Sequence, residues 1–149
     1  MPRFLLATQT FVDFVRSATS PVRAWLANAR RERGVSDLDL AVGVMSLVSL
    51  ERHFQDIERA GRFDGQKRAL RMRCETLTQE FRHRGGILPF SDDDLAIWAQ
   101  IQRLAPNLDE EGFVFATAIT RRLSLLARPE PIHAQLHPLG LLVEDPYVP

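Results

Sequence analysis

Arginine is the side chain through which this sequence could do most of its recognition chemistry. Of the 19 basic residues, Lys67 is the one lysine, and all the others are arginine. A guanidinium group is a planar fork that binds carboxylates and phosphates through paired hydrogen bonds. A genome rich in G and C favours arginine codons by base composition alone, which is the simpler explanation. The functional alternative is a self-complementary protein, or an arginine face that meets an acidic partner or RNA.

Positive and negative charges are divided unevenly along the chain. The formal net charge is zero, so there is no global basic field of the kind that indicates nucleic-acid binding. Residues 16–84 nevertheless carry 14 basic and 9 acidic side chains, whereas residues 85–149 carry 4 basic and 9 acidic ones. The two segments therefore have net charges of +5 and −5, and a charged partner remains open as an interpretation.

Carboxylates gather at Asp109, Glu110 and Glu111. Acids in the first turn of a helix stabilise its N-terminus, which explains this run as well as a metal-binding role does. The four histidines and the single cysteine, Cys74, show no metal-ligand spacing, so a structural zinc site is not expected. We expect the histidines on the surface or in loops, and Cys74 in the core.

Length and composition indicate one domain, residues 1–149, that lies in the cytoplasm and not in a membrane. Hydrophobic residues make up 45% of the 149, close to the average of globular proteins. No apolar run approaches the ~20 residues that a membrane span needs. The apolar run 4–7 is too short for a signal peptide, and a lone cysteine cannot form an internal disulfide, which favours a reducing compartment.

Short apolar runs alternate with amphipathic segments, which predicts an α/β sandwich with a mostly parallel sheet. Ligands bind such sheets beyond the carboxyl ends of the strands. The residues that follow each strand are therefore the ones to examine. The expected strands are 4–7, 40–47, 87–90, 124–127 and 141–143. The expected helices are 10–18, 20–34 with Ser20 as its N-cap, 49–60 with Ser49 as its N-cap, 64–85, 91–106 with a capping box, and 109–122.

Six segments, in order, carry a family resemblance: RFLLATQ (3–9), VRAWL (22–26), GILPF followed by AIWA (86–90 and 96–99), EGFVFATA (111–118), LLAR (125–128) and LVEDPY (142–147). In residue pattern and spacing they resemble the PIN-domain ribonucleases, in particular the VapC-like and FitB-like toxins of bacterial toxin–antitoxin pairs. The resemblance covers nearly the whole chain. It implies a PIN-like three-layer sandwich with a mostly parallel central sheet flanked by helices.

The resemblance also implies an endoribonuclease that uses Mg²⁺ or Mn²⁺ held by three or four carboxylates. Hard cations prefer oxygen ligands, and the metal lowers the pKa of a bound water and stabilises charge on the phosphate. Three of the family's four acid positions are replaced here, by Ala7, Arg52 and Pro129, and Glu111 is the acid in register. Glu111 is thus the one metal ligand that the resemblance supports.

Other acids lie close to the replaced positions. Glu51 precedes Arg52, and Asp109 and Glu130 lie beside the third and fourth positions. One residue along a helix turns a side chain by about 100°, so Glu51 reaches the site only if the helix starts differently. Arg52 could instead pair with Glu111 and supply positive charge where the metal would sit.

Two functions follow, and they leave enzymatic activity open. The first is a PIN-like protein that has largely lost its nuclease site, holds no metal, and acts by binding an antitoxin-like protein or RNA. Its expected substrate contacts are Thr8, Arg52 and Arg128. The second is an active metal-dependent endoribonuclease with a rearranged acid set, in which Glu51, Glu111 and Glu130, with Asp109, hold Mg²⁺ or Mn²⁺.

A homodimer is expected because the family usually pairs through helices near the second and third strands. An apolar stripe at helical spacing, formed by Leu70, Cys74, Leu77 and Phe81, is a candidate contact. Intramolecular packing explains this stripe equally well.

Overall fold

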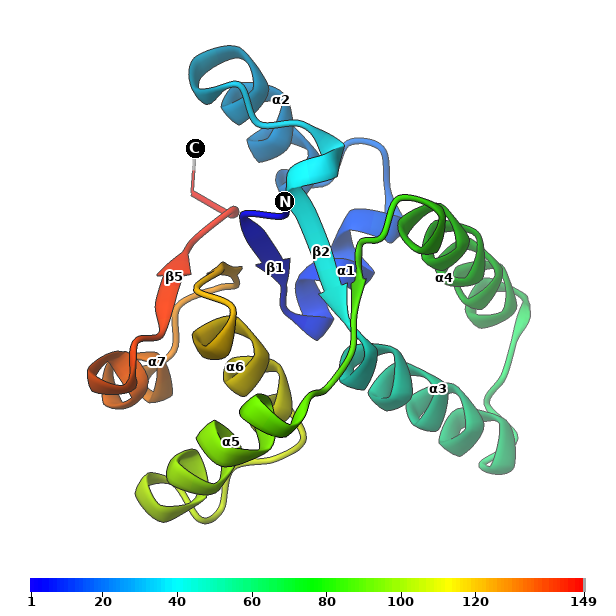
Figure 1. Ribbon diagram of the computed structural model, residues 1–149. Helices are drawn as coiled ribbons and strands as arrows, with labels where there is room; N and C mark the ends of the chain where they lie inside the picture. The colour runs from blue at the N-terminus through cyan, green and yellow to red at the C-terminus, as the bar shows by residue number, and fades with distance from the viewer. Residues whose placement is uncertain (149) are drawn as a thin grey trace.

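A parallel sheet of five strands forms the centre of the structure, a computed structural model in which residues 1–148 are described (Figure 1). The strand order is β3–β2–β1–β4–β5, and every neighbouring pair is parallel. Strand order therefore reverses beside β1, and this is the place where such sheets bind ligands. The strands are β1 (Phe4–Leu6), β2 (Leu40–Gly43), β3 (Ile87–Leu88), β4 (Ser124–Leu126) and β5 (Leu142–Glu144).

Seven helices in residues 1–148 cover the two faces of the sheet, so the predicted three-layer α/β sandwich is confirmed. Alternate residues of β1 point to opposite faces: Phe4 and Leu6 pack with α1–α4, and Leu5 packs with α5–α7. The helices are α1 (Thr8–Arg16), α2 (Pro21–Arg33), α3 (Val44–Arg59), α4 (Gly65–His83), α5 (Asp92–Leu104), α6 (Glu111–Thr120) and α7 (Pro131–Leu136), with short 3₁₀ turns at Asp37–Asp39 and His137–Leu139.

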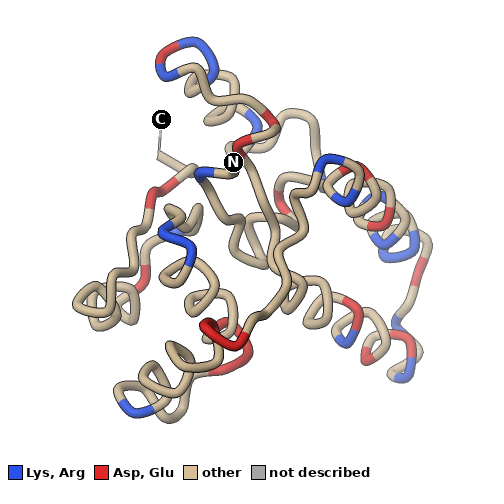
Figure 2. The backbone as a smooth tube through the Cα atoms, viewed as in Figure 1, with Lys and Arg blue, Asp and Glu red and all other residues tan. Residues whose placement is uncertain are grey.

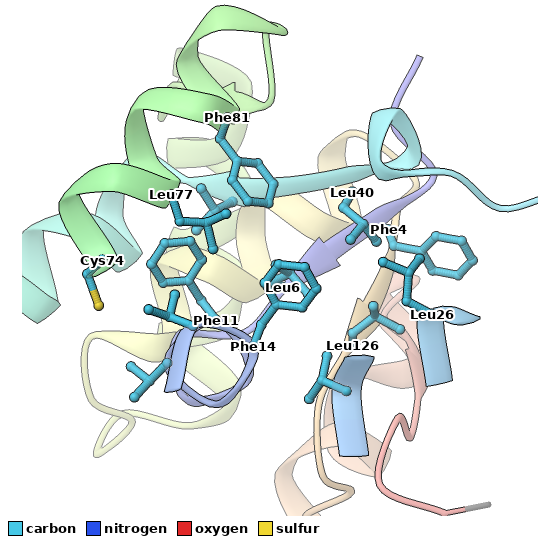
Figure 3. Packing of buried hydrophobic residues seen from close by; sticks show 14 of the residues in the cluster. Phe4, Leu6, Phe11, Phe14, Leu26, Leu40, Cys74, Leu77, Phe81 and Leu126 are labelled. Carbon is cyan, nitrogen blue, oxygen red and sulfur yellow. The ribbon is translucent and has the colours of Figure 1, made fainter. Parts of the chain in front are cut away.

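The apolar stripe of α4 is used inside the chain (Figure 3). Cys74, Leu77 and Phe81 are buried, and the Phe81 ring packs edge-on against Phe11 of α1 with centroids 6.0 Å apart. The prediction that Cys74 is a core residue is confirmed. Intramolecular packing accounts for this stripe, so the stripe is not available as a dimer contact.

For α2, α4 and α5, the helix begins or ends at the position predicted from its capping residue. The Ser20 hydroxyl accepts a hydrogen bond from the Arg23 N–H, and Gly34 ends α2 with a φ of 66°. Asp64 caps α4 by accepting from the Lys67 N–H, and Ser91 begins α5 with a capping box. Each signal lies within four residues of the helix end that it determines.

Two expectations about elements are wrong. Strand β2 ends at Gly43 and α3 begins at Val44, so Ser49 lies inside this helix and does not cap it. An apolar run such as 40–47 fits a buried strand and a buried helix equally well. Pairing with the short strands β1 and β3 decides where β2 ends, and its last residue, Gly43, lies opposite Leu88 of β3. The short helix α7 was not expected, although Pro131 stands at its first position. Within residues 1–148, no helix has the length and apolar character needed to span a membrane.

Candidate functional site

A pocket of about 600 Å³ lies beyond the carboxyl ends of β1 and β4, where the strand order reverses. Four carboxylates line it, and Arg128 is the one guanidinium among its described lining residues. It is called the Glu111 pocket below. The acids come from α1, from the start of α6 and from the segment after β4, and they are Asp13, Asp109, Glu111 and Glu130. Acidic segments at the starts of α5 and α6 are red in Figure 2.

Glu111 is the centre of this arrangement. It begins α6, and its Oε1 accepts a hydrogen bond of 3.1 Å from the Thr8 N–H. That N–H belongs to the first residue of α1 and has no partner inside the helix. Burial raises the pKa of the Glu111 carboxyl above its usual range, and the negative charges of Asp109 and Glu130 add to this, whereas the Thr8 hydrogen bonds lower it. Glu111 thus caps α1 from across the sheet edge.

The other acids of the 109–111 run also have structural partners. The Asp109 carboxylate accepts a hydrogen bond of 2.9 Å from the Glu111 N–H at the start of α6. Glu110 accepts a hydrogen bond of 2.7 Å from the Ser49 hydroxyl of α3. The Asp109 contact is that of an acid that stabilises a helix start, the first of the two interpretations of this run. The Glu110 contact instead joins the start of α6 to the middle of α3.

Arg52 does not pair with Glu111, so that expectation is wrong. Its guanidinium pairs with Glu110, the residue before α6, and it does not line the Glu111 pocket. The pair joins α3 to the start of α6 on the surface, since the Arg52 side chain is 66% exposed.

Glu51 lies on a different face of α3. Its carboxylate pairs with Arg71 of α4 at 2.5 Å, and this pair lines a separate pocket between α3 and α4. Pro129 is exposed in the connection between β4 and α7, and the next residue, Glu130, reaches the Glu111 pocket. The structure therefore brings Asp109, Glu111 and Glu130 together and leaves Glu51 apart.

Thr8 and Ala7 occupy the end of β1. The Thr8 hydroxyl bonds to the Ser46 hydroxyl of α3 at 2.9 Å, so both polar groups of Thr8 already have partners inside the protein. Ala7 is the N-cap residue of α1 and lines the Glu111 pocket with a methyl group. No oxygen ligand is present at the position where the resemblance places the first acid.

The donor set does not fit Mg²⁺ or Mn²⁺. Among residues 1–148, no group of three Asp, Glu, His or Cys side chains is arranged to hold a metal ion. The Glu111 carboxylate is engaged by the Thr8 N–H, and Glu51 is engaged by Arg71. A hard divalent cation gives up its water only for several oxygen ligands at once, and among the described residues the acids that line this pocket are not grouped closely enough to supply them.

The sequence did not identify Asp13, Tyr147 and His133 as residues of this pocket. Arg128, which also lines the pocket, is one of the expected substrate contacts. The Tyr147 hydroxyl donates to the Asp13 carboxylate at 2.5 Å, and the Arg128 guanidinium lies over the Tyr147 ring at 4.3 Å. Burial, followed by the bond to Asp13, raises the pKa of Tyr147 to about 12. The signal that could have indicated Tyr147 is its position at the end of the closing LVEDPY segment.

His133 is buried in α7, so the expectation that all four histidines lie on the surface or in loops is wrong for this one. Its Nδ1 accepts a hydrogen bond of 3.1 Å from the Glu130 N–H, and burial lowers its pKa. The Glu130–Pro131 pair, a cap followed by proline at the first helical position, could have placed His133 on a helix. The other three histidines are exposed, as expected.

No protein-family model and no curated protein matches the sequence. Several solved structures match almost the full chain. Three of them are FitAB bound to an IR36 DNA fragment (TM-score 0.68, 22% identity, 98% of this chain and 96% of that chain), FitAcB from Neisseria gonorrhoeae (0.64, 20%, 97% and 98%) and DNA-bound VapBC from Salmonella typhimurium (0.67, 14%, 98% and 99%). The strand order, the two helical layers and these likenesses agree: the chain has the PIN-domain fold of the FitB and VapC toxins.

Proposed function

We propose that this chain is a PIN-domain protein of the toxin–antitoxin type whose Mg²⁺-dependent endoribonuclease site is largely lost, and that it acts by binding an antitoxin-like protein or RNA. The observation that carries the proposal is the state of the Glu111 pocket. Ala7 stands at the end of β1, and Glu111 caps α1 through the Thr8 N–H. A site built in this way can keep the fold together without a cation.

The fold and the comparisons support the binding part of the proposal. FitAB and VapBC are described in their structures as bound to DNA, and each is a two-component assembly. The likeness to these assemblies extends over almost the full length of the chain, which supports the proposal that it has a surface for a partner of the same kind. An antitoxin-like protein is therefore the expected protein partner.

A homodimer is part of the same proposal. The helices that follow β2 and β3 are α3 and α5, and each exposes an apolar side chain. Val48 of α3 is 42% exposed and Leu95 of α5 is 51% exposed. Since burial of such side chains favours association, we propose that a second copy covers them.

A thermal melt of the purified protein, titrated with Mn²⁺ or Mg²⁺ against a chelator control, tests the loss of the metal site. A native-state site filled to 100 times its Kd adds about 2.7 kcal/mol, which for a domain of this size raises Tm by roughly 5–10 °C. We expect no saturable rise. The variant Ala7→Asp should also fail to cleave labelled RNA, because one new carboxylate leaves Glu111 engaged by Thr8.

One observation favours an active nuclease as a second candidate. Asp109, Glu111 and Glu130 share a pocket, and the first and third raise the pKa of Glu111. Carboxylates that lie this close together could act as ligands in a rearranged metal site. A saturable Mn²⁺ shift in the melt, reversed by the chelator and accompanied by RNA cleavage, would establish this candidate in place of the first.

A further inference from the structure

Four cationic side chains line two adjoining pockets at the C-terminal end of α1. The larger pocket, of about 490 Å³, is lined by Arg16 of α1 and by Lys67 and Arg73 of α4. The smaller, of about 300 Å³, is lined by Arg73 again and by Arg23 of α2. These four residues are called the basic track. None of the residues that line these two pockets also lines the Glu111 pocket.

Two guanidinium groups of the track are already held in place by the fold. Arg73 donates a hydrogen bond of 3.1 Å to the Arg16 carbonyl, and Arg23 donates one of 2.8 Å to the Phe14 carbonyl. The last carbonyls of α1 lack partners within their helix, and positive charge at a helix C-terminus is favourable. Arg23 also stacks on Phe14, 4.1 Å from the ring centroid. Groups fixed in advance lose little entropy when a ligand binds.

The positive charge of the track is not neutralised within the described chain. Among residues 1–148, none of the four side chains has a carboxylate at ion-pair distance. Arg71, on the same helix, has three such neighbours. The larger pocket has no acid among its lining residues, and Glu80 is the one acid that lines the smaller.

The neighbouring acids are committed elsewhere. Asp64 caps α4 by accepting a hydrogen bond of 2.9 Å from the Lys67 N–H. The N-terminus of α4 is therefore occupied, and the positive charge of the larger pocket comes from side chains. Asp13, one turn before Arg16, is held by Tyr147 and Gln9. Figure 2 shows the basic segments of α4 in blue, on the helix that Figure 1 places across the sheet from α5.

We propose that the basic track binds the phosphate backbone of single-stranded RNA. Guanidinium forks match phosphate oxygens, and a row of cations across two joined pockets matches a polymer with one charge per phosphate. Ala69, Leu70 and Met72 leave apolar surface beside the cations for sugars and bases. This inference deepens the RNA-binding part of the proposed function, because it says where the RNA lies.

Fluorescence anisotropy with a labelled single-stranded RNA, in the presence of a chelator, tests the track with the full chain. The variants Arg16→Gln, Lys67→Gln and Arg73→Gln each remove one cation. The matched control is Arg103→Gln, which removes an exposed cation from α5 on the other side of the sheet. At about 50 mM salt we expect each track variant to bind roughly three- to tenfold more weakly and the control to bind as the parent protein does.

Salt dependence adds a readout that a folding defect would not produce. For single strands, log K falls with log salt with a slope of about −0.7 per phosphate contact. Each track variant should therefore lower the slope by about 0.7. The Lys67 side chain makes no hydrogen bond or ion pair within residues 1–148, so Lys67→Gln tests the track without loss of a structural contact.

Three results would overturn the proposal: equal effects of the control and the track variants, binding of inorganic phosphate without binding of RNA, and tighter binding of a polyglutamate peptide than of RNA. The last would assign the track to an acidic protein partner. The chelator separates this test from the proposed function, since RNA cleavage after addition of Mg²⁺ would refute the loss of the nuclease and leave the track measurement unaffected.

Discussion

Glu111 has two opposite effects on the free energy of unfolding. Its carboxylate caps α1 through the Thr8 N–H, and its burial next to Asp109 and Glu130 penalises the charged form. Because the pKa of this carboxyl is raised in the folded state above its usual value of 4.5, the folded protein stays protonated at Glu111 to a higher pH than the unfolded chain does. The stability contributed by this group is therefore present at low pH, and it is lost as the pH rises from the pKa of the unfolded state through the pKa of the folded state.

The variants Glu111→Gln and Glu111→Ala separate the two effects. The amide oxygen of glutamine still accepts from Thr8 but carries no charge, so this variant should lose the fall in stability above about pH 4.5 that is due to residue 111. Alanine removes the cap and should cost about 1 kcal/mol. Urea unfolding of both variants from acidic to neutral pH measures this. A glutamine variant with the pH dependence of the parent would contradict the assignment.

Among the helices, the α5–α6 pair depends on one buried acid. Asp94 is fully buried, and its Oδ2 accepts from the Ser91 N–H at 3.1 Å and from the Thr117 hydroxyl of α6 at 3.0 Å. The variant Asp94→Ala loses the capping box and the hydrogen bond from Thr117, leaves the Ser91 N–H without its partner, and should cost about 2–4 kcal/mol. The exposed neighbour Asp93 is the control.

Chemical denaturation measures both changes. Asp93→Ala should stay within about 0.5 kcal/mol of the parent, since surface substitutions rarely do more. If the two variants lose equal stability, the effect belongs to the charge of the first turn of α5 and not to the contact with Thr117.

Helices were predictable from the sequence where the signal is local, and the site was not. Ser20, Asp64 and Ser91 determine helix starts through contacts three residues away, so pattern is sufficient. The partners of Arg52 and Glu51 depend on the phase of α3, and this follows from where β2 ends. That end is set by pairing with β3, in which Gly43 lies opposite Leu88, a residue far away in the sequence. The resemblance implies replacement of three acids, but the contacts of Ala7, Arg52 and Pro129 could not be read from the sequence.

At the scale of the whole molecule, the proposed homodimer predicts that the protein has the mass of two chains in solution. Val48→Asp places a charge on the apolar surface of α3 and should convert a dimer into a monomer, because an unpaired charge is costly to bury in an interface. Leu38→Asp is the control, since Leu38 is 65% exposed in the 3₁₀ turn before β2. Light scattering coupled to size exclusion measures both. A parent protein that is monomeric, or two variants that behave alike, would refute this surface as the dimer contact.

The absorbance of Tyr147 reports on the segment that contains this residue. It is the single tyrosine, and its hydroxyl is held by Asp13 under the Arg128 guanidinium. Its pKa is raised from 10.0 to about 12 in the folded protein, so stability from this group is complete below pH 10 and is lost as the pH approaches 12. We expect phenolate absorbance to appear late in an alkaline titration of the folded protein and near pH 10 in urea. Since no other phenol of this chain contributes, this one chromophore reports whether the segment at Tyr147 is docked on α1, in any variant and in the presence of RNA or any other partner that lacks tyrosine.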